Sequence, residues 1–375
     1  MSSRSALASR LPDPPGLAAL PRGARPVRRA FSPASLVLGL AVLAGLAVLP
    51  RFVDSPYALH VMILLFLSVV MGEAWNVLGG YAGQYSVGHA AFFGMGAYVT
   101  LMLMQFKQVP PWYGVFAAMA AALVLGVLVG SITFRLRGPY FVLASIAVAE
   151  ILRLVILNWK DLTNGAEGIL VTDVPPFKIG SWLVTDFSSK VPYYYAGLGL
   201  AVFVTLVNWA VQGSKLGYYF QAIREDQDAA HSLGINLSVY KNLALAISAV
   251  FTAWAGAYYA LYVGFIDPGT VLGTDISVQI VLVCIIGGIG TILGPMVGAL
   301  VLVTLSEALR SNVIAEALFR VGIVSEASRT GQFLKENLAH AHALIYGILV
   351  VVVILFMPDG VLGFARAALA RRRTA

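Results

Sequence analysis

Apolar residues fall in long runs along this chain, and polar residues gather in short stretches between them. A helix that crosses a bilayer needs about 20 mostly apolar residues, because each residue rises about 1.5 Å and the hydrocarbon core is about 30 Å thick. Ten runs approach or reach this length, near residues 34–50, 57–79, 85–105, 111–134, 139–158, 193–212, 242–264, 275–293, 294–310 and 342–357. The pattern predicts an all-α polytopic membrane protein with about ten transmembrane helices.

The composition agrees with a membrane protein. Of the 375 residues, 59% are hydrophobic and only 11% are charged, whereas a soluble domain carries about 25% charged residues. The chain therefore lacks the polar residues needed to cover a soluble globule, which excludes a soluble enzyme and a disordered regulator. Its single cysteine, Cys284, cannot form an internal disulfide, which excludes a secreted disulfide scaffold.

The charge pattern predicts the orientation of the chain. The formal net charge is +7, but the basic residues are scattered or terminal, so we expect no nucleic-acid partner. Cytoplasmic loops of membrane proteins are enriched in Lys and Arg. With ten spans and both termini in the cytoplasm, 15 of the 25 Lys and Arg residues lie inside. Six of the nine outside fall in the two longest outer loops, near 159–192 and 311–341. Both termini are therefore predicted to be cytoplasmic.

The ends of the chain differ from its centre. Residues 1–33 form an Arg- and Pro-rich stretch, and the first apolar run starts too far from Met1 for a secretory signal. We interpret 1–33 as an uncleaved cytoplasmic tail; a start codon upstream of the true Met is the alternative. A transmembrane domain is predicted over 34–363, with a cytoplasmic loop at 213–241, and a basic cytoplasmic tail over 364–375.

A glycine-rich stretch opens the third apolar run. Six glycines lie within residues 79–98, which favours close backbone approach and a break in regular helix. Irregular backbone at membrane depth occurs where protein buries it or where it lines a water-filled cavity. The stretch is thus either part of a translocation path, with Gly83, Gln84, Gly88 and His89 as candidates, or a site of tight helix packing. A similar but less pronounced glycine-rich stretch occurs at 287–299.

The longest charged stretch between two spans covers residues 216–236. Phe220, Ile223, Gln227 and Ala230 follow one another at helical spacing, and Gly234 after Leu233 is typical of a helix end. A short amphipathic helix over 218–232 would suit the docking of a cytoplasmic partner. An ordinary solvated loop is the alternative for such a charge run.

Several separated motifs resemble one family. The segment 228–234 resembles the Glu-Ala-Ala-x-x-x-Gly loop by which permeases of ABC importers dock on their ATPases, with Asp228 in place of the first Glu. Together with the stretches 83–94, 265–268 and 357–360, it resembles the LivM-type permeases, one of the two membrane subunits of branched-chain amino acid ABC importers. The resemblance runs from about Tyr57 to Gly363.

The resemblance implies an ABC importer permease fold in a bacterial inner membrane, surrounded by lipid. It implies a second, LivH-like permease, two ATPases and a periplasmic binding protein as partners. The chain has no Gly-x-x-x-x-Gly-Lys-[Ser/Thr] loop, so ATP and Mg would bind the ATPases, and we assign this chain no catalytic residue, cofactor or metal. The residues expected to dock the ATPase are Arg224, Glu225, Asp228, Ala229, Ala230 and Gly234.

Ionisable residues also occur inside the predicted spans, where they usually face a partner or a cavity. Glu150 and Arg153 stand three residues apart and can pair on one helix face. The pair either lines the translocation path or locks one helix to a neighbour. For Glu73, His89 and Glu307 a packing role is favoured.

Three other functions compete with a branched-chain amino acid importer. An amide or urea ABC importer has permeases that resemble this chain. An ion-coupled secondary transporter would need a convincing carboxylate site within the membrane, and the docking-type loop argues against it. A purely structural scaffold would have no use for glycine-interrupted spans.

Overall fold

The structure is a computed structural model that describes residues 33–310 and 347–348, 351, 355 and 360–364, without 54, 172–173, 176, 180–181, 186 and 188. The N-terminal tail up to residue 32, the segment 311–340, most of the predicted span 342–357 and the basic tail after Phe364 lie outside the described residues. The chain divides into two units, Met1–Leu46 and Ala47–Ala375. In the first unit the described residues are helical.

Most of the described chain is α-helical. The helices are α1 Pro33–Val48, α2 Pro56–Trp75, α3 Ala90–Lys107, α4 Pro111–Thr133, α5 Pro139–Asn158, α6 Lys160–Thr163, α7 Lys190–Gln212, α8 Lys215–Glu225, α9 Gln227–Ser232, α10 Leu237–Val263, α11 Pro268–Leu272, α12 Thr274–Gly287 and α13 Gly294–Arg310, with the 3-10 turns η1 Leu49–Arg51 and η3 Gly165–Glu167 and the π-helix η2 Asn76–Tyr81. Strands β1 Ile169–Leu170 and β4 Phe265–Ile266 pair antiparallel, as do β2 Phe177–Ile179 and β3 Trp182–Thr185.

The predicted apolar runs coincide with these helices. Nine of the ten runs lie on helices of the described chain. Six helical segments of the described residues are long and apolar enough to cross a membrane, namely Pro56–Tyr81, Pro111–Thr133, Pro139–Asn158, Lys190–Gln212, Leu237–Val263 and Pro268–Gly287. Two more, Val37–Arg51 and Gly294–Ala308, are apolar but shorter. The prediction of an all-α polytopic membrane protein is confirmed.

Local sequence signals set where several spans begin. Proline occupies the first turn of α2, α4 and α5, where its missing N–H would have no intrahelical partner in any case. The Asn236 side chain accepts a hydrogen bond from the N–H of Val239 at the start of α10. Such an N-cap satisfies one of the free donors of the first turn.

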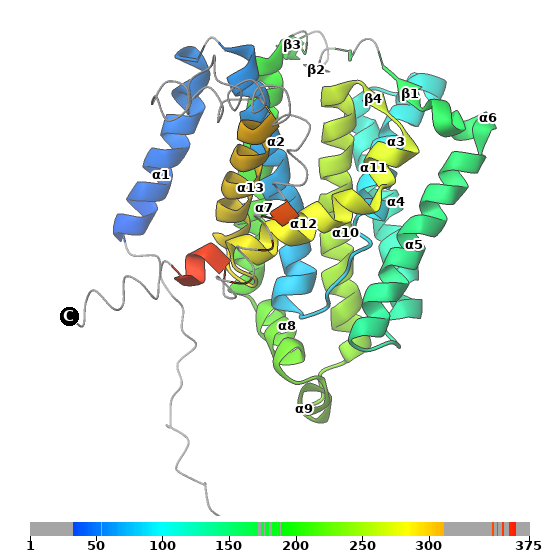
Figure 1. The fold of residues 1–375 in the computed structure, drawn as a ribbon, viewed down its shortest axis with the longest axis vertical. Helices are drawn as coiled ribbons and strands as arrows, with labels where there is room; N and C mark the ends of the chain where they lie inside the picture. Colours follow the sequence, from blue (N-terminus) through cyan, green and yellow to red (C-terminus); the bar gives the residue numbers. More distant parts are fainter. Residues whose placement is uncertain are drawn as a thin grey trace, which may run out of the picture. The chain divides into compact units, whose positions relative to one another are not determined.

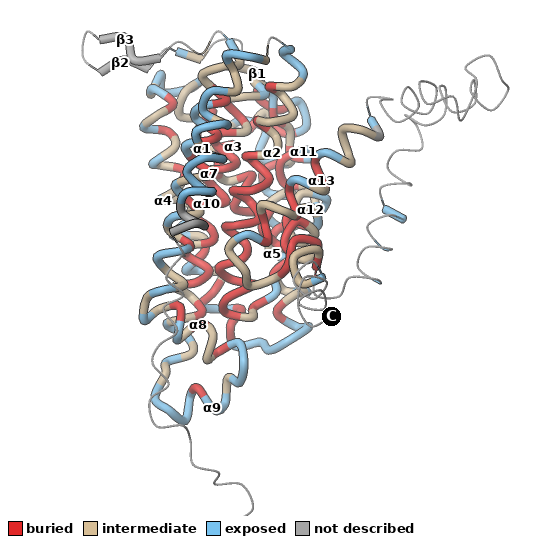
Figure 2. Tube along the Cα trace, turned by 90° about the vertical axis from the view of Figure 1, so that its left-hand side faces the viewer, coloured by how far each residue is buried: buried red, intermediate tan, exposed pale blue. Residues whose placement is uncertain are grey.

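The core of the second unit lies where α10 packs against α3 and α4, as the buried residues in Figure 2 show. The backbones of α3 and α10 touch there through two glycines. A Cβ on Gly96 would lie 1.9 Å from the carbonyl oxygen of Ala253, and one on Gly256 would lie 1.9 Å from that of Phe93. Small residues allow this approach between membrane helices.

The two ends of the helical bundle differ. Figure 1 places β1, β4 and α6 at one end, and α8 and α9 beyond the spans at the other. Helix α10 runs between the two ends, because it begins just after α9 and ends just before β4.

Candidate functional site

The glycine-rich stretch after α2 departs from regular helix, as predicted. Helix α2 widens into the π-helix η2, and residues 82–89 then form irregular backbone before α3 begins at Ala90. A Cβ on Gly79 would lie 2.3 Å from the ring of Trp75. Gly83 has φ +66°, a left-handed conformation that favours glycine. We name residues 76–89 the glycine segment.

Serine side chains from three helices support the glycine segment. The Ser145 hydroxyl of α5 accepts a hydrogen bond from the N–H of Val87 at 3.0 Å, and the Ser277 hydroxyl of α12 accepts one from Ala90 at 2.8 Å. Ser248 of α10 lies 2.7 Å from Nε2 of His89. The irregular backbone is therefore hydrogen-bonded within the protein, which is the condition for such backbone at membrane depth.

The residues predicted to line a path are mostly enclosed. His89 is fully buried, and its ring nitrogens contact Ser86 and Ser248. Gln84 is buried and donates a hydrogen bond to the carbonyl of Ala82. A Cβ on Gly88 would lie 2.1 Å from the carbonyl oxygen of Ser145. In this conformation these groups pack the protein, and their part in a path stays a prediction.

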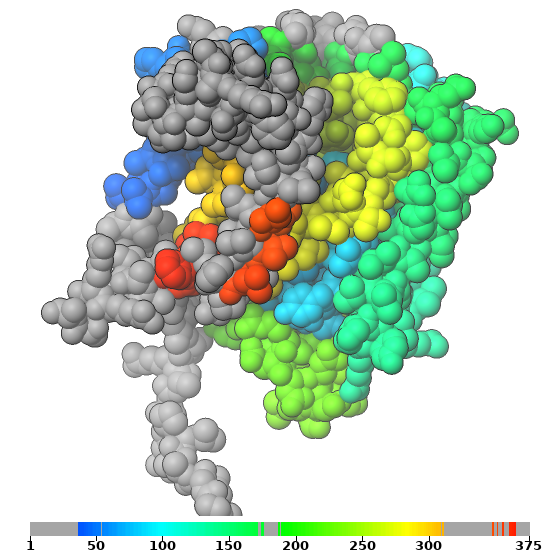
Figure 3. All heavy atoms as spheres, in the orientation of Figure 1, coloured from blue at the N-terminus to red at the C-terminus, as the bar shows by residue number. Residues whose placement is uncertain are grey.

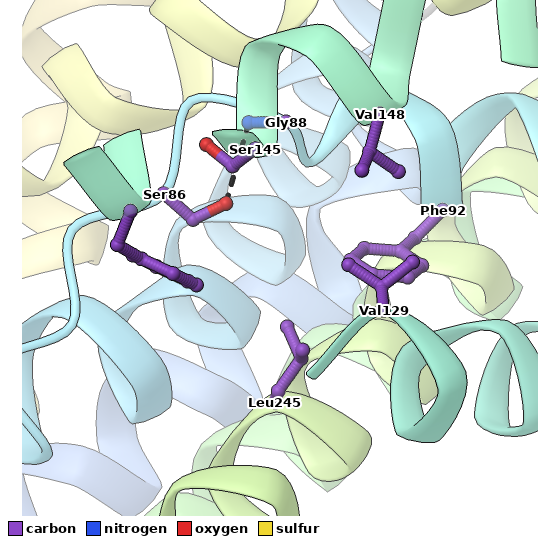
Figure 4. A pocket seen from close by; sticks show the side chains of 8 residues that line it. Ser86, Gly88, Phe92, Val129, Ser145, Val148 and Leu245 are labelled. Carbon is purple, nitrogen blue, oxygen red and sulfur yellow. Dashed lines mark hydrogen bonds between the residues drawn. The ribbon is translucent and has the colours of Figure 1, made fainter. Parts of the chain in front are cut away.

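A small cavity adjoins the glycine segment. It is lined by Ser86, Gly88, Phe92, Val129, Phe141, Ser145, Val148 and Leu245. Figure 4 shows the hydrogen bond from the N–H of Gly88 to the Ser86 hydroxyl at its edge. Its lining is almost entirely apolar, and its volume of about 10 Å³ holds at most one water molecule. An amino acid does not fit there.

The expected docking helix is two helices rather than one. A single helix over 218–232 was predicted, but α8 ends at Glu225 and α9 begins at Gln227. Asp226 has extended backbone, with φ −155°, and its carboxylate accepts hydrogen bonds from the N–H groups of Asp228 and Ala229. Asp226 is thus the N-cap of a second helix, which ends the first. The helical spacing did not reveal this break.

Gly234 closes α9 as predicted. Its φ is +86°, its N–H donates to the carbonyl of His231, and the N–H of Ile235 donates to that of Ala230. This pair of hydrogen bonds is the Schellman arrangement, in which the residue after the helix is left-handed. Nothing lies within 4 Å of where its Cβ would be, so only the backbone conformation requires glycine.

The side chains of α8 and α9 differ in exposure. Phe220 and Ile223 of α8 and Ala230 of α9 are buried against the chain, which confirms the amphipathic pattern. Ala229 is exposed. Asp228 is also exposed but forms an ion pair with Arg137 of the α4–α5 connection at 3.1 Å. Glu225 pairs with Arg224. The exposed surface of α8 and α9 is therefore mixed in charge.

Arg224 joins the end of α8 to the glycine segment. Its guanidinium donates a hydrogen bond to the carbonyl of Gly80 at 3.0 Å, and a Cβ on Gly83 would lie 2.7 Å from its Cγ. A Cβ on Gly290 would lie 2.7 Å from its Nη1. One side chain thus touches both glycine-rich stretches that the sequence singled out.

The same two stretches are joined to each other. The Asn76 side chain accepts a hydrogen bond from the N–H of Gly290 at 2.9 Å and donates one to the carbonyl of Thr291 at 2.9 Å. Gly290 and Thr291 lie in the turn between α12 and α13. We name Arg224, Asn76, Gly80, Gly83 and Gly290 the glycine joint.

Glu73 and Glu307, the two acids favoured for a packing role, each have a hydrogen-bonding partner on another helix. Glu73 of α2 and Asn208 of α7 are both fully buried, and the Asn208 side chain donates to a carboxylate oxygen of Glu73 and to its carbonyl. The Tyr57 hydroxyl donates to Glu307 at 3.1 Å. Both acids connect one helix to another, in keeping with the packing role favoured for them.

Glu150 and Arg153 form the predicted pair on α5. The Nε of Arg153 donates to one carboxylate oxygen of Glu150 at 2.9 Å and the Nη2 to the other at 2.6 Å. Their side chains are 43% and 27% exposed, respectively. The guanidinium thus binds the carboxylate through two hydrogen bonds, and such bidentate Arg–carboxylate pairs are among the stronger ion pairs in proteins.

Sequence reasoning missed Asn76, Ser145, Ser248 and Ser277. Each is an uncharged polar residue in or beside an apolar span. Each bonds to the glycine segment, to Ala90 directly after it, or to the turn after α12. A lone serine or asparagine in a span signals a hydrogen bond to another helix. That signal does not say which helix, so the cluster needed the structure.

Apolar helices long enough to cross a membrane, an irregular glycine segment enclosed among them and a helix pair beyond them together characterise a polytopic membrane protein. Residues 57–354 match the family model described as the branched-chain amino acid transport system permease component. The chain belongs to this family, and its resemblance to LivM-type permeases is confirmed.

Relatives support the same assignment. The chain is 28% identical over 291 residues to the high-affinity branched-chain amino acid transport system permease protein LivM of Escherichia coli K12, covering 73% of this chain and 68% of that one. It is 24% identical over 330 residues to the LivH permease of the same system and strain, covering 82% and 97%. The autoinducer 2 import system permease protein LsrC of Enterobacter sp. 638 is 28% identical over 211 residues, covering 52% and 57%. No solved structure matches the chain.

Proposed function

We propose that this chain is a permease subunit of an ATP-driven importer for branched-chain or related hydrophobic amino acids. It forms half of the translocation path in a bacterial inner membrane, with both termini in the cytoplasm. Its partners are a second, LivH-like permease, two ABC ATPases that bind ATP and Mg, and a periplasmic binding protein.

The observation that carries this proposal is the helix pair α8–α9. It lies beyond the spans at one end of the bundle (Figure 1), and its outer surface holds exposed small and charged side chains. Its inner surface is fixed to the protein by Phe220 and Ile223, which are fully buried. A helix anchored in this way moves together with the spans, so a partner that binds the helix and shifts it also shifts the spans.

The glycine joint supplies the route for that motion. Arg224 stands at the end of α8 and contacts the two stretches where α3 and α13 begin. A displacement of α8 by an ATPase would therefore reach two spans through hydrogen bonds and van der Waals contact. Packed elements transmit such shifts because they are bistable rather than continuously deformable.

The docking assignment predicts the effect of Gly234→Val. Valine at φ +86° is strained by about 1–3 kcal/mol, which would shift α9 without disturbing the spans. We expect the variant to insert and to pair with its sister permease, while co-purification of the ATPase, or hydrolysis coupled to transport, falls severalfold. Both are measured on the complex purified through the sister permease.

Gly213→Val is the matched control. Gly213 starts the same loop but has φ −83°, which any residue can adopt, and the nearest atom to its added Cβ would be 3.6 Å away. We expect this variant to bind and stimulate the ATPase normally. Equal, undiminished ATPase association in both variants would show that the loop is an ordinary connection.

A further inference from the structure

The ion pair on α5 occupies an unusual place for charged groups. Glu150 lies 11 residues after the first residue of α5 and 8 before the last, about 16 Å and 12 Å along the axis. The pair therefore lies near the middle of a predicted span. Charged residues at this depth face a partner or a water-filled cavity rather than lipid.

The pair lies on an uncovered side of α5. Val148 lines the cavity beside Val129 of α4 and Leu245 of α10. Glu150 and Arg153 follow Val148 by two and five residues, which places them about 160° and 140° around the helix axis from it. Their exposed fractions of 43% and 27% agree with this position. The pair thus points away from the packed side formed by α4 and α10.

Part of the glycine segment is also exposed, next to α5. Figure 3 shows a face on which α5 (green) and the yellow α11 and α12 border the light-blue stretch after α2. Helix α5 packs against α11 and α12, and Ser145 bonds it to Val87 of the glycine segment. Tyr85 of that segment is 49% exposed. An irregular and partly exposed stretch therefore lies beside α5, the helix that carries the ion pair.

We propose that the Glu150–Arg153 side of α5 lines the water-filled path and contacts the two charged groups of a zwitterionic amino acid as it passes. This inference rests on the proposed function and adds the residues that meet the substrate. An amino acid carries one ammonium and one carboxylate group, which complement Glu150 and Arg153. When no substrate is present, Glu150 and Arg153 hydrogen-bond to each other. A passing amino acid would replace these hydrogen bonds with its own, so its net binding would be weak, as passage requires.

The first test measures water at this face. The one native cysteine, Cys284, is fully buried, so single introduced cysteines report on their own surroundings. Ile146→Cys lies one turn from Glu150 on the same side of α5. Val124→Cys is the control, because Val124 lies at mid-span on α4 and is 59% exposed on an apolar face. Thiolates form and react in water but not in lipid.

We expect a charged methanethiosulfonate reagent to label Ile146→Cys at least about tenfold faster than Val124→Cys in the assembled complex in membranes. Leucine with ATP should slow the labelling of Ile146→Cys. Labelling of Ile146→Cys no faster than the control overturns the proposal, whether lipid or the sister permease covers this face.

The second test separates a substrate contact from a structural ion pair. Glu150→Gln and Arg153→Gln should each lower ATP-dependent leucine uptake roughly tenfold, as the loss of a charged hydrogen bond predicts. The exchanged double variant Glu150→Arg with Arg153→Glu keeps an ion pair but reverses its direction. A structural pair would be restored by the exchange, whereas a pair that orients substrate would not.

We therefore expect the exchanged variant to assemble with its partners and to remain at least about fivefold impaired in uptake. Full uptake in the exchanged variant overturns the proposal. The wild-type complex is assayed in parallel, so that failure of the proposed function can be told from failure of the path assignment. If the wild-type complex does not accumulate leucine with ATP, the proposed function fails. If the wild-type complex and the exchanged variant both accumulate leucine normally, only the path assignment fails.

Discussion

Replacing Gly256 with alanine is expected to destabilise the permease strongly, although the change adds a single methyl group. The new Cβ would lie 1.9 Å from the carbonyl oxygen of Phe93, and backbone cannot move aside as a flexible side chain can. Helices α3 and α10 would have to separate at the centre of the core. Overpacking of this kind costs about 3 kcal/mol, which for 375 residues corresponds to a fall of about 4 °C in the thermal unfolding midpoint.

Gly199→Ala provides the matched control for this prediction. Gly199 also lies within a predicted span, α7, but nothing lies within 4 Å of its added Cβ. Alanine there gains about 0.5–1 kcal/mol of helix propensity over glycine, so the midpoint should stay or rise slightly. Both are measured by heating the detergent-solubilised complex and following the folded fraction. Equal midpoints for Gly256→Ala and Gly199→Ala would contradict the close contact of α3 with α10.

Removing the Arg224 side chain is expected to uncouple hydrolysis from transport. In Arg224→Ala the carbonyl of Gly80 loses its guanidinium donor, and α8 loses its contacts with Gly83 and Gly290. The buried residues Phe220 and Ile223 still hold α8 in place. The ATPase should therefore still co-purify, while the amount of leucine carried per ATP hydrolysed falls roughly tenfold, as loss of a charged hydrogen bond predicts.

Lys215→Ala is the control for Arg224→Ala. Lys215 is a basic residue at the other end of α8, and its side chain is exposed and makes no ion pair within the described residues. Its removal changes the charge of the helix by the same amount and should leave the transport ratio unchanged. If both variants lower the amount of leucine carried per ATP hydrolysed to the same extent, the cause is the loss of positive charge from the docking surface. The glycine joint would then not transmit motion to the spans.

The main lines of the fold followed from the sequence because apolar runs of sufficient length have few alternatives in a bilayer. The interruption near Gly83 was also predictable, since several glycines in an apolar run favour a break. The pairing of Glu150 with Arg153 followed from their spacing on one helix. Each of these predictions depends on residues that are close in the chain.

The features that sequence reasoning missed depend on tertiary neighbours or on a local signal that was overlooked. Ser145, Ser248 and Ser277 come from three helices, and no spacing rule links them to the glycine segment. Arg224 was assigned to the docking surface because it belongs to a charged stretch, yet its guanidinium reaches inward to Gly80. The break at Asp226 was readable in principle, because aspartate is a preferred N-cap residue.

The central claim is that this chain is a permease driven by ATP hydrolysis on partner subunits, and one measurement tests it directly. The purified complex with its sister permease, ATPases and binding protein is placed in proteoliposomes with no ion gradient, and radiolabelled leucine uptake is followed. The account predicts accumulation only when ATP and Mg are on the ATPase side. Uptake that proceeds without ATP and follows an imposed Na⁺ or H⁺ gradient would contradict it.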